Sequence, residues 1–144
     1  MEMKFVRKVF IAVLLTPFIF STSCEKIFPI VNCNECLGYE PYEATVKVKT
    51  GSNYTIFGAV TVNVYEGNDT SGEKIKTFYP SDTESTVLLS LNKTYTLEAI
   101  YIEAGKTYRA LDSVKPSVKY TDSECDEECW YIYNNRVDLR LKYM

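Results

Sequence analysis

The chain has 144 residues, of which 46% are hydrophobic and 24% charged, and its 16 basic and 19 acidic side chains give a formal net charge of −3. This length suits one domain or two at most, and the composition is that of a globular protein, which excludes disorder, a collagen-like chain or a polytopic membrane protein for the bulk of the sequence. The chain contains no histidine, which excludes Ser-His-Asp and Cys-His nucleophile activation and every metal site built on imidazole.

Residues 1–23 have the features of a secretory signal peptide. Lys4, Arg7 and Lys8 give a positive start, and an apolar run of 12 residues extends from Val9 to Phe20. A basic start, a short apolar stretch and small residues before a cleavage point are typical of a signal for export. A membrane-spanning helix needs about 20 apolar residues, so this run is too short for a transmembrane segment.

Small residues lead up to Cys24, where cleavage has two possible outcomes. Ordinary cleavage before Cys24 would release a soluble secreted protein. The ending Ser21-Thr22-Ser23-Cys24 also resembles the serine-rich lipobox of Bacteroidetes lipoproteins. That resemblance implies that Cys24 becomes the first residue, carries palmitate-type acyl chains and anchors the protein in the bacterial cell envelope, at the outer membrane and facing either the periplasm or the surface. The total of five cysteines agrees with it, because lipidation of Cys24 leaves four that can pair.

The exported part of the chain is acidic. Residues 25–144 keep 13 basic and 18 acidic side chains, a net charge of −5, and no two basic residues are adjacent in this part. Nucleic acids and anionic membrane surfaces are bound through clusters of Lys and Arg. We therefore expect no nucleic-acid partner and no electrostatic binding to membranes.

Residues 24–42 indicate a lipidated cysteine and a tether, and residues 43–144 a single folded domain. In the latter, short runs alternate between apolar and polar side chains and are separated by turn residues, which predicts an all-β fold: a single Greek-key β-sandwich of about seven or eight strands. The apolar positions of each run should face the core. The core residues predicted in this way are Val46, Val48, Val60, Val62, Val64, Leu97, Ala99, Leu139 and Leu141.

Two segments carry a resemblance to a known class of domain. The stretch Leu91–Ala99 and the alternating stretch Val137–Leu141 resemble prealbumin-like, carboxypeptidase-regulatory-type β-sandwich modules, over residues 44–143 in all. The resemblance implies a Greek-key sandwich with a corner tyrosine, Tyr95, whose hydroxyl binds upstream main chain. It implies an architecture that is common in surface lipoproteins, and no activity.

Four cysteines are the strongest chemical signal in the exported chain: Cys33 and Cys36, and Cys125 and Cys129. Four thiolates could hold zinc in a tetrahedral site. Disulfides persist outside the cytoplasm, so we predict disulfides rather than zinc, with at least one bridge between residues 33–36 and 125–129 and the register left open. We predict no metal and no cofactor, and we interpret the acidic residues around Cys125 as a solvated loop.

A binding surface is expected from the tyrosines and the loops. Tyr131 and Tyr133 alternate with Trp130 and Ile132, so one of these two pairs should face outward and could stack sugars or contact a partner. The loops 66–73 and 122–129 lie next to strand ends. The candidate binding residues are Tyr131, Tyr133, Asp69 and Asp126.

These features predict a membrane-anchored lipoprotein of the cell envelope that acts as a non-catalytic binding or structural module for a protein or glycan partner. No catalytic residue is expected, because no carboxylate pair lies in an apolar context. The alternative is an accessory subunit of a surface assembly, like the strand-donating fimbrillin-type lipoproteins. A small extracytoplasmic hydrolase is a third hypothesis, which the missing histidine disfavours.

Overall fold

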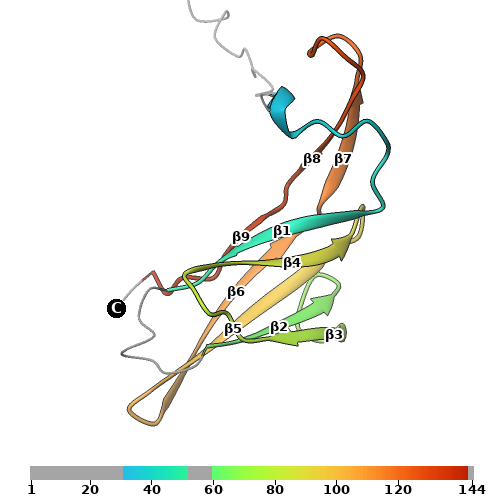
Figure 1. The fold of residues 1–144 in the computed structure, drawn as a ribbon. Helices are drawn as coiled ribbons and strands as arrows, with labels where there is room; N and C mark the ends of the chain where they lie inside the picture. Colours follow the sequence, from blue (N-terminus) through green and yellow to red (C-terminus); the bar gives the residue numbers. More distant parts are fainter. Residues whose placement is uncertain (1–30, 52–59, 143–144) are drawn as a thin grey trace, which may run out of the picture. The chain divides into compact units, whose positions relative to one another are not determined.

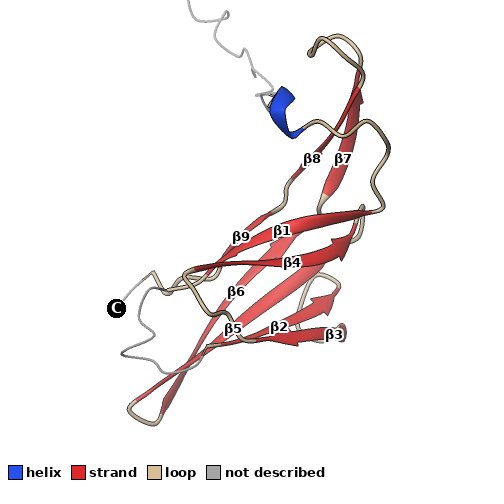
Figure 2. Cartoon of the chain, in the orientation of Figure 1, coloured by secondary structure: helices blue, strands red, loops and turns tan. Residues whose placement is uncertain are grey.

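The protein is a small, mostly-β protein with several sheets. The computed structural model describes residues 31–51 and 60–142, and in these residues it contains nine strands in three sheets and one 3-10 helix (Figures 1 and 2). The prediction of an all-β protein is confirmed. The signal peptide and Cys24 lie outside the described residues. No helix in the described part of the chain has the length and hydropathy needed to cross a membrane.

The first sheet has three strands in the order β4-β1-β9. The central strand β1 (Glu43–Lys49) pairs antiparallel with β4 (Glu84–Ser90) and parallel with β9 (Arg136–Asp138). Apolar and polar residues alternate along β1, and the structure buries its apolar positions and exposes most of the others. This sheet therefore has one face toward the core and one toward solvent.

The second sheet has four antiparallel strands in the order β3-β2-β5-β6. The turn between β5 and β6 has only two residues, Ala104 and Gly105, both with positive φ (47° and 76°). Two consecutive left-handed residues make the type I′ turn that matches the twist of a hairpin. The strands are β2 (Thr61–Glu66), β3 (Glu73–Phe78), β5 (Tyr95–Glu103) and β6 (Lys106–Val114).

The two sheets share one hydrophobic core. Valines of β1, β4 and β9 and apolar residues of β2 and β5 belong to the same buried cluster. Each large aliphatic side chain in such a cluster contributes about 1.5–3 kcal/mol to stability. Eight of the nine predicted core residues are at most 1% exposed, and the ninth, Leu141, is partly buried and packs against the cluster.

A third sheet is formed by the hairpin of β7 (Ser117–Thr121) and β8 (Cys129–Tyr133). The sequence predicts β8 but not β7. Lys115 and Pro116 separate β7 from β6. Because proline has no N–H to donate to a neighbouring strand, the pairing of β6 with β5 ends at Val114. The chain beyond Pro116 pairs with β8 instead. Figure 1 shows β7 continuing in the direction of β6, with the hairpin tip at the end away from the β5–β6 turn.

A buried tyrosine connects the two larger sheets. The hydroxyl of Tyr101 on β5 donates to the main-chain oxygen of Leu139 (2.7 Å) and accepts from the main-chain nitrogen of Gly51 (3.1 Å). Tyr101 is 1% exposed, so each of these bonds replaces a bond to water that burial removes. The resemblance to prealbumin-like modules implied this kind of contact for Tyr95, whereas in the described residues Tyr101 makes it.

Candidate functional site

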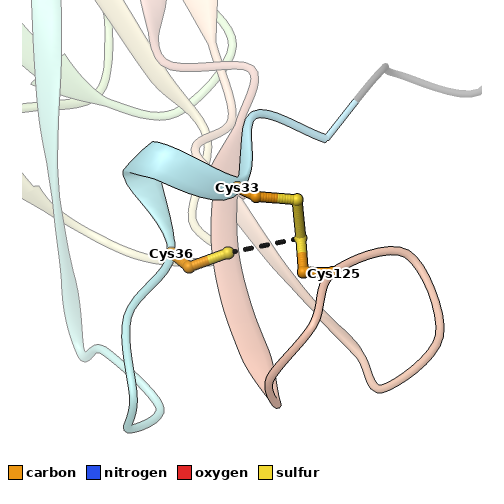
Figure 3. Close-up of side chains that lie close together, drawn as sticks. All are labelled: Cys33, Cys36 and Cys125. Atoms are coloured by element: carbon orange, nitrogen blue, oxygen red, sulfur yellow. Dashed lines mark hydrogen bonds between the residues drawn. A yellow bond between two sulfur atoms is a disulfide. The ribbon is translucent and has the colours of Figure 1, made fainter.

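Two disulfides fasten the N-terminal segment to the β7–β8 hairpin. Cys33 is bonded to Cys125 and Cys36 to Cys129, with sequence separations of 92 and 93 residues. Figure 3 shows Cys33 and Cys36 on the N-terminal segment and Cys125 on the hairpin loop. The predicted cross-pairing between residues 33–36 and 125–129 is confirmed, and its register is now assigned. We refer to residues 33–37 together with residues 122–129, the hairpin loop and Cys129, as the stapled tip.

Local main-chain structure presents the first two cysteines to the hairpin. Cys33 begins a single 3-10 turn (Cys33–Glu35), which Asn32 caps by accepting a hydrogen bond from the Asn34 nitrogen (3.2 Å). Beyond it, Leu37 pairs with Trp130 through two main-chain hydrogen bonds of 2.9 and 3.0 Å. The described part of the predicted tether is therefore attached to β8 by covalent and hydrogen bonds.

The four sulfur atoms differ in their exposure and lie close together. Cys33 is exposed, Cys36 and Cys125 are half-buried, and Cys129 is 0% exposed. The Sγ atoms of Cys36 and Cys125 are 3.6 Å apart, the dashed line of Figure 3, although each is bonded to a different cysteine. Sulfurs in disulfides carry no proton, so this is a non-bonded contact. The sulfurs occur as disulfides, as predicted, rather than as the thiolates that a zinc site requires.

The stapled tip is strongly acidic. Residues 31–37 and 121–130 contain no Lys or Arg, and all of their acidic side chains are exposed. The pKa of the Tyr120 hydroxyl is raised by burial and by the nearby carboxylates of Glu128 and Asp122. The potential around the disulfides is therefore negative. The acidic residues are Glu35, Asp122, Glu124, Asp126, Glu127 and Glu128.

The predicted aromatic platform is arranged differently from the expectation. Tyr131 is only 6% exposed and Tyr133 is half-buried, so they form no open stacking surface. On the opposite face of the hairpin, Tyr120 packs against Trp130 with ring centroids 5.0 Å apart, and Tyr120 remains 39% exposed. Of the two faces, the one that carries Tyr120 and Trp130 offers an aromatic contact to solvent.

The two predicted aspartates do not lie in one site. Asp126 is exposed in the stapled tip. Asp69 lies in the loop between β2 and β3, where its carboxylate accepts hydrogen bonds from the main-chain nitrogen (2.8 Å) and the hydroxyl (2.5 Å) of Ser71. These bonds lower the pKa of Asp69. The geometry of Asp69 is that of a turn-forming aspartate.

A buried polar network that the sequence analysis did not identify crosses the four-stranded sheet. The side chain of Glu98 on β5 is buried, and its carboxylate accepts from Arg109 Nη1 (2.7 Å), Tyr65 OH (3.1 Å) and Asn63 Nδ2 (3.3 Å). Asn63 Oδ1 in turn accepts from Thr77 (2.8 Å). A charged residue in the middle of an otherwise apolar strand was the available signal. Because the carboxylate is fully engaged, the network is suited to holding strand register rather than to proton transfer.

A hollow of about 450 Å³ lies beside β9 on the three-stranded sheet. Asp138 there is paired with Arg140, whose guanidinium donates two hydrogen bonds (2.6 and 2.8 Å) and holds the pKa of Asp138 well below its usual range. Ligand pockets are mostly apolar with a few polar groups, whereas the lining here is mostly charged: Lys47, Lys49, Glu84, Arg136, Asp138 and Arg140.

Comparisons with protein-family models, with curated proteins and with solved structures find no significant match to this chain. Among the described residues, the stapled tip is the feature with the most specific chemistry.

Proposed function

We propose that this protein is a lipid-anchored, non-catalytic binding or structural module of the bacterial cell envelope. The observation that carries the proposal is the pair of disulfides in the stapled tip. Disulfides persist in oxidising compartments, which indicates an extracytoplasmic location. The lipobox-like sequence before Cys24 supports attachment to a membrane on that side.

The disulfides also give an anchor at Cys24 a mechanical function. Cys33 is the first residue covalently tied to the hairpin, and it follows Cys24 by nine positions. Nine residues reach at most about 30 Å. Membrane attachment at Cys24 would thus limit the distance between the lipid and Cys33 to about 30 Å.

The architecture proposed for the domain is a Greek-key sandwich of the prealbumin-like type. The common core of the three-stranded and four-stranded sheets supports it. Such domains serve many unrelated functions, so the fold is a scaffold and the contacts are made by particular surfaces. An anchored domain of this kind would contact a protein or glycan partner through such surfaces.

Cys24→Ala is expected to move the protein from the membrane to the aqueous phase. Two or three acyl chains give an attachment that is nearly irreversible, at about 0.8 kcal/mol for each buried methylene. Detergent-phase partitioning of wild type and variant, both expressed with the complete signal peptide, measures the difference. Equal aqueous fractions for the two proteins would refute the anchor.

A second candidate function, strand addition in a surface assembly, is supported by the edge strand β4. Strand β4 lies at one edge of the three-stranded sheet, where β1 is its only neighbour among the described strands. Its register with β1 contains no bulge. It carries a single charged residue, Glu84, and its outward Leu88 is 52% exposed. Natural edge strands are usually protected by lysines or bulges, as β3 is by both.

If β4 pairs with a strand of another protein, chemical cross-linking in the native envelope should give adducts between the two. Leu88→Lys is expected to abolish these adducts, because a lysine on an edge strand opposes strand pairing. Ile102→Lys is the matched control, since Ile102 is 55% exposed but lies on the inner strand β5. Adducts that survive Leu88→Lys, or that Ile102→Lys removes equally, would exclude β4 as the docking strand.

A further inference from the structure

We propose that the stapled tip is a thiol-exchange site, in which an external thiol that is cationic or uncharged opens the Cys33–Cys125 disulfide and Cys125 then passes the exchange to the Cys36–Cys129 disulfide. This goes beyond the anchored-module function and does not depend on lipidation. The proposal is based on the exposure of the four sulfurs, the contact between the two disulfides and the charge around them.

The two disulfides are unequally accessible. The outer one, Cys33–Cys125, has an exposed cysteine that an external thiolate can reach, whereas the inner one includes Cys129, which is 0% exposed. Disulfide exchange requires a thiolate to approach a sulfur directly. The outer disulfide should therefore react first, with attack at Cys33 and with Cys125 as the leaving thiolate.

The freed Cys125 sulfur is already placed for a second exchange. It lies 3.6 Å from the Sγ of Cys36 (Figure 3), in van der Waals contact and close to the separation of about 3–3.5 Å at which a nucleophile attacks. Attack by Cys125 forms a Cys36–Cys125 bond and releases Cys129 as a thiolate. Cys129 sulfur, which external reagents cannot reach, is thereby reduced through Cys125.

Atoms and electrons balance when the reductant is a dithiol. Its first sulfur forms a mixed disulfide with Cys33, and its second sulfur displaces Cys33, so the dithiol leaves as a cyclic or internal disulfide. The two electrons end in the chain as two thiols, at Cys33 and Cys129, which take the two protons of the dithiol. One disulfide, Cys36–Cys125, remains.

The acidic side chains of the stapled tip select among thiols. An anionic thiol approaching Cys33 meets Glu35 and the carboxylates of residues 122–128, all exposed and without a nearby Lys or Arg in those segments. Exposed charges interact over about 8–10 Å at moderate salt. Cationic thiols should be attracted and anionic ones repelled, and added salt should remove the difference.

The exchange is tested by treating the oxidised protein with one equivalent of dithiothreitol, an uncharged dithiol, followed by acid quenching, alkylation in denaturant, which exposes the buried Cys129, and peptide mapping. The expected product has alkylated Cys33 and Cys129 and a Cys36–Cys125 linkage. Alkylated Cys33 and Cys125 with an intact Cys36–Cys129 bridge would show that the outer disulfide opens without relay, and would overturn the proposal.

Two single variants test the same step without a reductant. Cys33→Ala leaves Cys125 unpaired beside Cys36, and we expect the Cys36–Cys125 linkage to accumulate. Cys125→Ala is the matched control: the remaining Cys33 Sγ lies within 4.8 Å of Cys36 Sγ, whereas Cys125 Sγ touches it at 3.6 Å, so the Cys36–Cys129 disulfide should persist to a greater extent in this variant. Both retain one cross-link between the segments, and circular dichroism checks their fold. If Cys33→Ala keeps only Cys36–Cys129, the relay is wrong.

Charge selection is tested by comparing the rates at which cysteamine, a cationic thiol, and mercaptoethanesulfonate, an anionic thiol, open the outer disulfide. The two reagents differ in intrinsic reactivity, so the readout is the change in their rate ratio. We expect the cysteamine rate divided by the mercaptoethanesulfonate rate to fall about tenfold between low and high salt. The same ratio should fall at low salt when Glu127 and Glu128 are changed to Gln. A ratio unaffected by salt and by these changes would overturn the selection.

Discussion

Replacing all four cysteines of the stapled tip by alanine is expected to lower the free energy of unfolding by about 7 kcal/mol, against about 2.5 kcal/mol for removing either disulfide alone. The first bridge closes a loop of 92 or 93 residues, which is worth about 4.7 kcal/mol in the chain-entropy model. With one bridge present, the second closes a ring of only about eight residues, worth about 2.5 kcal/mol.

The measurement is urea denaturation of three variants: Cys33→Ala/Cys125→Ala, Cys36→Ala/Cys129→Ala, and the variant lacking all four. Because a small domain is stable by only about 5–15 kcal/mol, loss of both bridges removes a large part of the total, whereas each double variant should stay folded. Each pair is the control for the other, since their loops have nearly equal length. If the loss of unfolding free energy in the variant lacking all four cysteines equals the sum of the losses in the two double variants, the bridges close independent loops and the prediction is wrong.

Strand alternation allowed most of the core to be predicted from the sequence, because a strand with one buried face reveals that face through its period of two. Alternation does not identify the buried residues of a strand whose two faces are both covered. On β5, Thr96 and Glu98 are 3% and 2% exposed although they alternate with the core residues Leu97 and Ala99. Glu98 is buried by its contacts with neighbouring strands, which no local period can reveal.

Contacts between distant segments explain what the sequence left open at the site. The register of the disulfides depends on how the 3-10 turn at Cys33 meets a loop about 90 residues later, and spacing alone does not determine this. The same holds for Tyr131. Alternation placed it on the face opposite Trp130, but alternation alone does not determine which of the two faces becomes buried.

Val62→Asp is expected to prevent folding of the domain. Val62 lies on β2 between Ala99 of β5 and Phe78 of β3, and it is 0% exposed in the common core. The substitution removes the burial of an aliphatic side chain, worth about 1.5–3 kcal/mol, and adds a carboxylate whose effective desolvation costs several kcal/mol. The sum of about 5 kcal/mol or more is comparable to the whole stability of a small domain.

Leu88→Asp is the matched control, because it also replaces a strand aliphatic by a charge but at a position that is 52% exposed. It should change the free energy of unfolding by about 0.5 kcal/mol, as surface substitutions do. The loss of unfolding free energy caused by Val62→Ala should lie between those of the two other variants, since this substitution leaves a cavity without adding a charge. Far-UV circular dichroism and urea denaturation distinguish the three variants. If Val62→Asp unfolds no more readily than Leu88→Asp, then Val62 faces water in solution, and the register that pairs β2 with β5 is shifted by one residue.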